Sequence, residues 1–543
     1  MRLVKGAYWD TEIKRAQQQG LAGYPVFTRK ANTDLAYLAC ARRLLELGRW
    51  VYPQFASHNA HTVAAVAELA GSRRDFEFQR LHGMGAALFD RVVDEWGLPC
   101  RVYAPVGSHR ELLPYLVRRL LENGANTSFV NRIIDADLPA EALLADPAEQ
   151  VRADPERGAP RLPLPAEIYG QRKNSAGVAF DDPLALHRLC QGIERALTKA
   201  WRAVPWVGRE GRDGDERPVT APADRRIEVG RVVEADRTVA AEAMAAAAAG
   251  FRDWNAVPVP ERAAVLERAA DLLEGHREEL MALVCREGGR SLPDALAEVR
   301  EAADFCRYYA LQARQTLDTR ELPGPTGERN TLSADGRGVF ACVSPWNFPV
   351  AIFTGQVAAA LVAGNAVVAK PAHQTPLCGM RVVELLHEAG VPADALQFLP
   401  GASGELGEAL LTDPHLAGVA FTGSTATARD MARTLAAREG PIIPLVAETG
   451  GQNALLVDSS ALPEQVIQDT VRSAFNSAGQ RCSALRVLFL QEEIADGLLD
   501  LLAGAMDELA VGDPLDLATD CGPVIDTAAR DKLRRHIERI ERE

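Results

Sequence analysis

Short apolar runs alternate with amphipathic stretches over the first 133 residues of the chain. Four of the runs are rich in β-branched and aromatic residues, and each precedes or adjoins a helical pattern, which predicts parallel βαβ units. The clearest helical period lies in RELLPYLVRRLLENG, where apolar residues recur at helical spacing and Gly124 supplies a stop signal. The predicted strands are RLVKGAY (2–8), RWVYPQFAS (49–57), FEFQRLHG (76–83) and CRVYAPVG (100–107).

Side chains with useful chemistry lie at the ends of these predicted strands. Tyr8 and Trp9 follow the first, His58 and Asn59 follow the second, and Tyr103 lies on the fourth. In a β/α barrel this rim is where binding and catalytic sites are built. A closed barrel needs eight strand–helix units, and this region contains four. The pattern therefore predicts half of a barrel, with a different α/β arrangement as the alternative.

The same alternation returns from residue 339 onward. Five short apolar runs, most of them followed by a helical pattern, predict a doubly wound, Rossmann-like nucleotide-binding sheet. The G-x-G-x-x-G fingerprint of dinucleotide-binding sheets is absent, so this prediction needs support from other residues. The five runs are GVFACVSP (338–345), NAVVAKP (365–371), LQFLPG (396–401), GVAFTGS (418–424) and IPLVAETGG (443–451).

Residues 134–222 differ in pattern from both of these regions. They are rich in proline and mix acidic with basic residues, and GREGRDGDERPVTAPADRR (208–226) is typical of an exposed linker. We therefore expect a domain boundary here. The alanine-rich segment 238–254 predicts a packed surface helix, because alanine is the best helix former.

Composition narrows the class of function. A chain of 543 residues with 47% hydrophobic content can form several cores, at roughly one domain per 150 residues. A formal net charge of −14 disfavours nucleic-acid binding and favours small-molecule chemistry. Nine cysteines without a C-x-x-C pair or zinc-finger spacing argue against a disulfide framework or a metal site, and suit a reducing cytoplasm.

Neither a signal peptide nor a membrane span is predicted. The N-terminal stretch has no sustained apolar run after its basic residues. The apolar segment 351–369 is long enough to suggest a span, but Gln356 and Asn365 are polar and Gly355 and Gly364 interrupt it. We expect a buried helix followed by a buried strand.

Five motifs near the ends of the predicted strands carry more specific chemistry. Their order and intervals resemble the aldehyde dehydrogenase family over residues 223–543. Oxidising an aldehyde needs a soft nucleophile, donors for the oxyanion, a hydride acceptor and a base that activates water. The motifs are SPWNFP (344–349), AKPAHQTP (369–376), FTGSTATA (421–428), AETGGQN (447–453) and GQRCSALR (479–486).

The resemblance implies catalytic roles for three residues. Cys482 is the nucleophile, the Asn347 side chain and the Cys482 backbone N–H form the oxyanion hole, and Glu448 activates the deacylating water. A lone cysteine is more often a small buried hydrophobe. That interpretation stays preferred for the other eight cysteines.

The resemblance also implies how the cofactor and the substrate bind. Lys370, Gly423 and Ser424 match positions that hold the ribose and phosphates of NAD. His373 stands where the family commonly has a carboxylate that binds the adenosine ribose, which leaves the choice between NAD and NADP open. Ser483 matches the residue type of the branch that acts on glutamate semialdehyde, where its hydroxyl can bind the substrate carboxylate.

A second set of motifs resembles the flavin-dependent proline dehydrogenase barrel. The match is nearly continuous over residues 1–133. Its fold, the carboxyl-terminal half of a (β/α)8 barrel, agrees with the strand count. The motifs are RLVKGAYWDTEIKRAQ (2–17), FTRKANTD (27–34), FASHNAHT (55–62), EFQRLHGMG (77–85), RVYAPVG (101–107) and YLVRRLLENGANTSFVNRI (115–133).

Adjacent arginines suit the carboxylate of a free amino acid, because their forked donors can bind it bidentately. Arg118 and Arg119 match the pair that has this role in the proline dehydrogenase family. The alternative is a solvated basic face beside a leucine stripe. The resemblance further implies that Ala7, Tyr8, Leu81 and Tyr103 surround the proline ring, and that Arg2, Lys5, Trp9, Thr28, Lys30, His58, Asn59 and Glu122 contact FAD.

A barrel, a linker and an aldehyde dehydrogenase in one chain resemble the bacterial bifunctional enzymes of proline catabolism. The resemblance implies FAD-dependent oxidation of L-proline to pyrroline-5-carboxylate and NAD-dependent oxidation of glutamate semialdehyde to L-glutamate. It also implies a quinone as electron acceptor of the flavin, peripheral contact with the inner membrane, and a homo-oligomer. No metal and no nucleic acid are expected as partners of this segment.

Compared with that family, the strands before RLVKGAYWD and the segment after 543 are absent, so the chain resembles the middle of a longer protein. Two alternatives stay open: an inactive fragment, and an aldehyde dehydrogenase of another substrate class. The expected domains are a partial proline dehydrogenase barrel (1–133), a linker (134–222), the NAD-binding domain (223–446) and a truncated catalytic domain (447–543).

Overall fold

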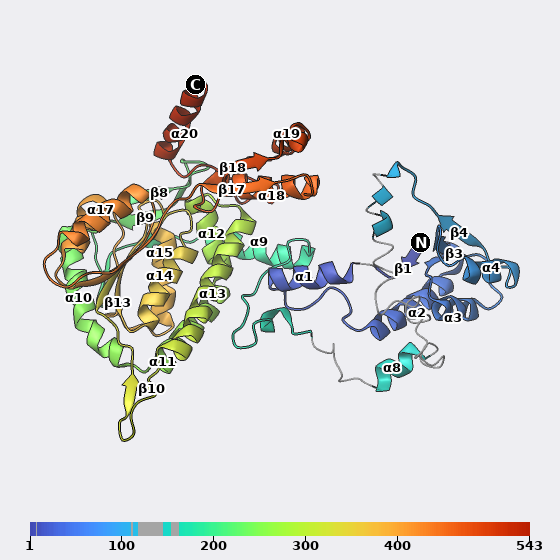
Figure 1. Cartoon of the computed structure of the whole chain (residues 1–543), viewed down its shortest axis with the longest axis horizontal. Coiled ribbons are helices and arrows are strands. Elements are labelled where there is room, and N and C mark those ends of the chain that lie inside the picture. Colours follow the sequence, from blue (N-terminus) through green and yellow to red (C-terminus); the bar gives the residue numbers. More distant parts are fainter. Residues whose placement is uncertain (7, 110–111, 114, 118–144, 154–161) are drawn as a thin grey trace. The chain divides into compact units, whose positions relative to one another are not determined.

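The computed structural model divides the chain into two units, residues 1–168 and 169–543. It describes every residue except 7, 110–111, 114, 118–144 and 154–161 (Figure 1). Most of the helix predicted over 110–124 therefore lies outside the described residues.

A four-stranded parallel sheet forms the centre of the first unit, in the order β1-β2-β3-β4. Leu3 pairs with Phe55, Phe55 with Phe78, and Phe78 with Cys100. Each strand is followed by at least one helix, which confirms the predicted βαβ pattern. The elements are β1 (Arg2–Val4), α1 (Trp9–Gln19), α2 (Lys30–Glu46), β2 (Gln54–Ala56), α3 (Ala60–Ala70), β3 (Glu77–Leu81), α4 (Ala86–Asp94), β4 (Cys100–Tyr103) and α8 (Pro147–Ala153).

An aromatic core packs the helices of this unit onto its sheet. The rings of Phe55 and Phe76 meet edge to face at 5.8 Å between centroids, and those of Phe76 and Phe78 do so at 5.6 Å. Phe89 brings α4 to the same cluster. Edge-to-face pairs of buried rings stabilise beyond the area they bury. The core therefore fixes the strand ends on which the predicted flavin contacts lie.

A seven-stranded sheet forms the centre of the second unit, in the order β16-β15-β12-β13-β14-β6-β7. Its first five strands are parallel, and they coincide with the five predicted runs. The elements are β12 (Val339–Val343), α14 (Ala351–Val362), β13 (Ala366–Lys370), α15 (Pro376–Glu388), β14 (Leu396–Phe398), α16 (Gly404–Thr412), β15 (Leu416–Thr422), α17 (Thr425–Ala436) and β16 (Leu445–Glu448).

Helices cover both faces of this sheet, which confirms the doubly wound prediction. Side chains alternate across a strand, so Val367 and Ala369 of β13 pack with α11, α13, α14 and α15, while Ala366 and Val368 pack with α10, α16 and α17 (Figure 1). The apolar segment 351–369 forms α14 and β13, as expected. No helix within the described ranges is long and apolar enough to cross a membrane. The helices α10 (Arg237–Ala256), α11 (Val259–Gly275), α12 (Arg277–Gly288) and α13 (Leu292–Thr316) precede the sheet.

Part of the segment predicted as a linker carries regular structure. Short strands lie within 208–226, and β6 pairs with β14 in the large sheet. Charged neighbours pair on these strands, for example Arg202 with Glu216, which explains their polar sequence. The domain boundaries stay a prediction. The elements are α9 (Pro183–Leu197), β5 (Trp201–Ala203), β6 (Trp206–Val207), β7 (Glu210–Gly211), β8 (Glu216–Thr220) and β9 (Glu228–Val233).

Residues 453–543 form a smaller sheet and several helices, and an antiparallel pair of short strands within 320–332 precedes the large sheet. Strands β17 and β18 are parallel, and among the described strands each pairs only with the other. The chain between them contains the Cys482 motif. The elements are β10 (Arg320–Leu322), β11 (Asn330–Leu332), β17 (Asn453–Val457), α18 (Pro463–Phe475), the 3-10 turn η3 (Asn476–Gly479), β18 (Leu485–Leu490), α19 (Glu492–Asp507) and α20 (Thr527–Ile540).

Candidate active site

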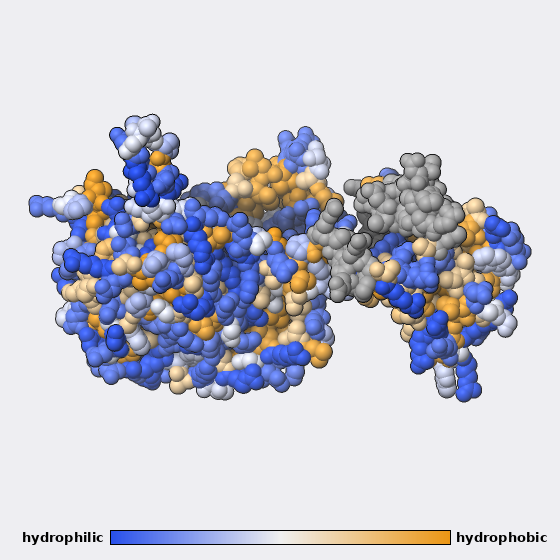
Figure 2. Space-filling view, turned by 90° about the horizontal axis from the view of Figure 1, so that it is seen from below, coloured by the Kyte–Doolittle hydropathy of each residue, from blue (hydrophilic) through white to orange (hydrophobic). Residues whose placement is uncertain are grey.

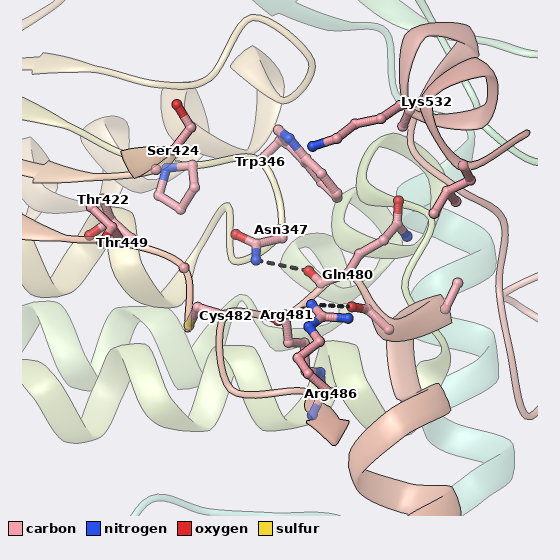
Figure 3. A pocket seen from close by; sticks show the side chains of 17 residues that line it. Trp346, Asn347, Thr422, Ser424, Thr449, Gln480, Arg481, Cys482, Arg486 and Lys532 are labelled. Carbon is pink, nitrogen blue, oxygen red and sulfur yellow. Dashed lines mark hydrogen bonds between the residues drawn. The ribbon is translucent and has the colours of Figure 1, made fainter. Parts of the chain in front are cut away.

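A cavity of about 500 Å³ lies at the carboxyl ends of the parallel strands. Asn347 reaches it from the loop after β12, Gly423 and Ser424 from the turn after β15, and Cys482 from the loop before β18. Ligands of doubly wound sheets bind at this edge. Figure 3 shows these side chains, drawn from segments far apart in the sequence, around one space.

The nucleophile loop is held mainly by hydrogen bonds. Cys482 is exposed, and its carbonyl oxygen accepts a hydrogen bond from Asn453 Nδ2 at 2.8 Å. Arg486 Nη2 donates to the carbonyl oxygens of Gly479 and Arg481 at 3.1 and 3.0 Å. These bonds leave the Cys482 thiol open to the cavity, which suits a nucleophile that must meet a substrate.

Asn347 lies beside this loop and is tied to it. Its Nδ2 donates to the carbonyl oxygen of Gln480 at 2.9 Å. An amide NH₂ group has two protons, so one remains for a substrate oxyanion. The backbone carbonyl oxygen of Asn347 accepts a hydrogen bond from Arg290 Nη1. Both the side-chain amide and the backbone carbonyl of Asn347 are therefore held in place. One proton of the amide stays available as a donor.

Glu448 and Ser483 lie close to the cavity in sequence but do not line it. Glu448 ends β16, is exposed, and its carbonyl oxygen accepts from Gly423 N at 3.0 Å. The next residues, Thr449 and Gly450, line the cavity. Ser483 follows Cys482 and is exposed. Their predicted roles stay predictions.

Lys370 ends β13 beside a second cavity of about 220 Å³. The side chain is 1% exposed, and Nζ donates to the Gly401 carbonyl oxygen at 3.0 Å and to Ser403 Oγ at 3.4 Å. Burial lowers the pKa of the Lys370 ammonium to about 8, against the attraction of Glu234. Apolar Val343 and other side chains complete the walls. An apolar slot with one amine at its end fits the adenosine part of NAD.

The turn at Gly423 and Ser424 fits the phosphates of the same cofactor. A Cβ at Gly423 would lie 2.5 Å from the Phe421 ring, so only glycine fits there. Ser424 Oγ caps α17 by accepting from Thr427 N at 3.1 Å. The amino terminus of a helix attracts negative charge. The residues present at this edge therefore fit NAD.

His373 lies just outside this region, in contact with other charged groups. Its Nδ1 is 3.1 Å from Glu234 Oε1, without the geometry of a hydrogen bond. Arg217 Nη2 lies 2.9 Å from the same carboxylate oxygen. Burial, and next Arg217, lower the pKa of His373. A carboxylate is thus present near His373, supplied by Glu234 after β9.

Cations of the first unit gather around Asp34. Lys5 Nζ donates to Asp34 Oδ1 at 2.6 Å and to Thr62 Oγ1 at 2.9 Å, and Lys30 Nζ lies 2.8 Å from Asp34 Oδ2. Burial lowers the pKa of Lys5, and the two lysines hold the pKa of Asp34 below its usual value despite its burial. Lys5 also lies 5.2 Å from the Tyr37 ring centroid.

The other predicted flavin and proline contacts lie on the strands of the first unit's sheet or near the starts of α1, α2 and α3. Arg2 stacks over the Tyr103 ring at 5.4 Å, and His58 Nε2 accepts from Leu81 N at 3.1 Å. Arg118, Arg119, Glu122 and Ala7 lie outside the described residues. Asn59 caps α3 and Trp9 Nε1 donates to the Phe27 carbonyl oxygen, while Tyr8 is exposed and Thr28 is half-buried.

Several residues that shape the site were missed from the sequence. Arg290 and Asp294 lie under the cavity and contact Asn347, Ser477 and Arg481. Ser477 lies two residues before the Cys482 motif, but nothing in the local sequence indicates its buried partner 183 residues earlier. Such a pairing has no local pattern, so covariation between homologues is the signal that could have found it.

Two family models match the chain. The aldehyde dehydrogenase family model covers residues 206–543 and the proline dehydrogenase model covers residues 1–132. The first match spans more than half of the sequence. The chain belongs to the aldehyde dehydrogenase family. The proline dehydrogenase family uses FAD and the aldehyde dehydrogenase family uses NAD, in agreement with the two cofactors expected from the motifs.

The chain is similar to proteins named bifunctional protein PutA and to proteins named 1-pyrroline-5-carboxylate dehydrogenase. Bifunctional protein PutA of Klebsiella aerogenes is 50% identical over 99% of this chain and 42% of its own length. The 1-pyrroline-5-carboxylate dehydrogenase of a Geobacillus strain is 35% identical over 65% of this chain and 69% of that protein. A solved proline utilization A mutant from Bradyrhizobium japonicum is 52% identical, with a TM-score of 0.90 over 100% of this chain and 52% of that one.

These relatives confirm the resemblance to the bifunctional enzymes and the fold inferred from it. The chain spans less than half of the length of the Klebsiella protein.

Proposed function

We propose that the chain is part of a bifunctional enzyme of proline catabolism, and that its second unit holds the site oxidising glutamate semialdehyde to L-glutamate with NAD. The observation that carries the proposal is the 500 Å³ cavity, where Cys482, Asn347 and Ser424 meet. These residues supply a nucleophile, an oxyanion donor and a phosphate-binding turn at one strand edge. Relatives named 1-pyrroline-5-carboxylate dehydrogenase support the substrate.

The first half of the reaction uses the nucleophile and the oxyanion donors. The Cys482 thiolate adds to the aldehyde carbon and forms a thiohemiacetal, whose oxyanion accepts hydrogen bonds from Asn347 Nδ2 and the Cys482 backbone N–H. When bound, NAD accepts the hydride that leaves this carbon. The product is a thioester on Cys482.

The second half needs water. Glu448, at the end of β16, takes a proton from water, which adds to the thioester carbon and displaces the Cys482 thiolate. One aldehyde, one NAD and one water thus give one carboxylate, one NADH and two protons, the second of them from ionisation of the acid. Ser483 and its hydroxyl are proposed to bind the distal carboxylate of the substrate.

For the first unit we propose a share in FAD-dependent oxidation of L-proline to pyrroline-5-carboxylate. Lys5, Trp9 and His58 follow the carboxyl ends of β1 and β2 and bring a positive charge and two aromatic rings there, while the Arg2 guanidinium lies over the Tyr103 ring at the end of β4. This donor set fits an anionic, aromatic cofactor. Arg118 and Arg119 are proposed to bind the proline carboxylate. When bound, FAD accepts the hydride of proline.

The proposal extends to the electron acceptor, the oligomeric state and the cellular location of the complete enzyme. We propose that a quinone reoxidises the flavin, that the complete enzyme is a homo-oligomer, and that it works in the cytoplasm with peripheral contact to the inner membrane. All nine cysteines are free in the structure, which suits a reducing compartment.

The test is an assay of NADH formation from glutamate semialdehyde, with Cys482→Ser as the matched control. We expect activity in the unaltered enzyme and a loss of at least about 10³-fold in the variant, because an alcohol is a much weaker nucleophile than a thiolate. NADH production that survives in Cys482→Ser would contradict the proposal.

The same assay separates the alternatives. Faster turnover of another aldehyde across a panel would favour a different substrate class. Absence of NADH formation, together with absence of proline-dependent dye reduction, would favour the inactive fragment.

A further inference from the structure

The main chain leading into Cys482 has an unusual conformation. Ser477 and Ala478 have φ angles of 55° and 54°, and Gly479 follows at 68°. Within the described part of the chain, Ser477 and Ala478 are the only non-glycine residues with positive φ. Left-handed backbone is costly for residues that carry a Cβ, and it persists where neighbouring groups hold it.

Asp294, in the first turn of α13, is the group that holds this segment. Its Oδ2 accepts from Ser477 Oγ at 2.8 Å, and its Oδ1 accepts from Arg481 Nη2 at 2.6 Å. Arg481 Nε also donates to Ser477 Oγ at 3.1 Å. Ser477 is 6% exposed and Asp294 is 8% exposed, so water competes little with these bonds.

The residues just before and after Asp294 hold the other half of the site. Arg290 donates to the carbonyl oxygen of Asn347 and lies 4.5 Å from the Phe348 ring centroid. Glu298 Oε2 accepts from the backbone N–H groups of Val350 and Ala351 at 3.1 Å each. One buried segment, residues 290–298, therefore contacts both the oxyanion-donor loop and the nucleophile loop.

We propose that Asp294 is a positioning residue for the nucleophile: its paired bonds to Ser477 and Arg481 hold the left-handed segment 477–479 and so keep Cys482 in its place at the wall of the cavity. The inference rests on the proposed function only in assigning Cys482 as nucleophile. Asp294 touches neither substrate nor cofactor in this role. It acts through the conformation of the loop.

Two variants of Asp294 and one matched control test the proposal. Asp294→Ala removes both bonds, whereas Asp294→Asn keeps an acceptor for Ser477 and loses the charge that neutralises Arg481. Asp304→Asn is the control, because Asp304 lies on the same helix about 15 Å further along. It accepts from Arg172 Nη1 at 3.0 Å and from Ser175 Oγ at 2.7 Å, so it makes the same kinds of bond away from the site.

The first readout is the alkylation rate of Cys482 by iodoacetamide, followed by mass spectrometry of its peptide in the full chain. Exposed Cys40 serves as internal reference, and buried Cys342 reports unfolding. We expect the ratio of the Cys482 rate to the Cys40 rate to rise about fivefold in both Asp294 variants, because the released loop 477–481 moves more freely and exposes the Cys482 thiol to the reagent more often. Asp304→Asn should keep the ratio within about twofold, and Cys342 should stay unreacted throughout.

The second readout is steady-state aldehyde oxidation. We expect kcat to fall about 100-fold in Asp294→Ala, with a smaller loss in Asp294→Asn and little change in KM, since a misaimed nucleophile still binds substrate nearby. A Cys482 ratio that is unchanged in Asp294→Asn, or that changes equally in Asp304→Asn, would overturn the inference. If the alkylation ratio shifts but no variant or parent oxidises the aldehyde, the proposed function fails and the positioning role stands.

Discussion

The seven-stranded and the two-stranded sheet of the second unit both have site residues next to their strands, but the two sheets differ in how they are held. Strands β12 and β13 of the seven-stranded sheet are almost wholly buried between two layers of helices. In the two-stranded sheet, Leu456 of β17 is 78% exposed and Phe489 of β18 is 56% exposed. Figure 2 shows hydrophobic side chains gathered on the surface of this unit.

The difference teaches how each part of the site keeps its geometry. Packing against two hydrophobic layers fixes the ends of β12 and β13, and hence Asn347 and Lys370. A sheet of two strands is marginal by itself, so packing alone cannot fix the loop before β18. Cys482 instead depends on hydrogen bonds to other elements, including those between Asp294 and the 477–481 segment.

The largest effect should come from truncating matched phenylalanines in the two sheets. Phe398 of β14 is 0% exposed and meets the Phe353 ring edge to face at 6.2 Å. Phe398→Ala should lower the free energy of unfolding by about 3–5 kcal/mol, through lost burial and the cavity left behind. Phe489→Ala should change it by about 0.5 kcal/mol or less. Urea unfolding of both variants checks this, and equal losses would remove the contrast.

A smaller effect on the free energy of unfolding should come from pH, through Glu298, a residue of α13 that faces the start of α14. Burial raises the pKa of its carboxyl from 4.5 to about 7, against the attraction of Arg290, while nearby Glu301 raises it further. Between these values the folded chain holds a proton that the unfolded chain releases. The contribution of Glu298 to the free energy of unfolding is therefore full below pH 4.5 and is lost as pH rises through 7.

Glu298→Gln isolates this contribution, because its amide does not titrate. From the lower to the upper end of this pH window, the free energy of unfolding should fall less in the variant than in the parent. The two decreases should differ by on the order of 1–3 kcal/mol. Unfolding by urea at a pH on either side of the window measures the difference from the parent. Parallel pH profiles for parent and variant would show that Glu298 keeps its ordinary pKa in the folded chain.

The smallest effect should come from His373, at the cofactor end of the large sheet. His373→Glu places a second carboxylate beside Glu234, where it would repel a 2′-phosphate and accept from a 2′-hydroxyl. We expect the ratio of the NADP dissociation constant to the NAD dissociation constant to rise about tenfold. This corresponds to a change of about 1.4 kcal/mol in the difference between the two binding free energies. Titration calorimetry with each nucleotide measures it. An unchanged ratio would place the ribose elsewhere.

Burial on both faces makes β13 predictable from the sequence. Because β13 is covered on both faces, its residues form a continuous apolar run, AVVA, that is visible in one dimension. Strands β7 and β8 were missed because they are short and polar: Glu210 and Gly211 form all of β7, and Arg217 of β8 is paired with Glu234. Ion pairs across a sheet leave no apolar pattern.

The candidate site divides in the same way. Cys482, Asn347 and Ser424 each belong to a motif that is contiguous in sequence and follows or precedes a predicted strand, so their presence around one cavity could be predicted. The role of Asp294 could not be predicted, because its partners are set by the packing of α13 under the loop and not by neighbours in the chain. Glu448 shows the limit of motif reasoning, since its neighbours line the cavity and its own side chain does not.

The central claim is that Cys482 forms a thioester that Glu448 helps to hydrolyse, and rapid mixing of Glu448→Gln with glutamate semialdehyde and NAD tests it most directly. The account predicts a burst of about one NADH per active chain followed by slow turnover, because the amide cannot accept a proton from water once the thioester has formed. Steady turnover at the parent rate without a burst would contradict it.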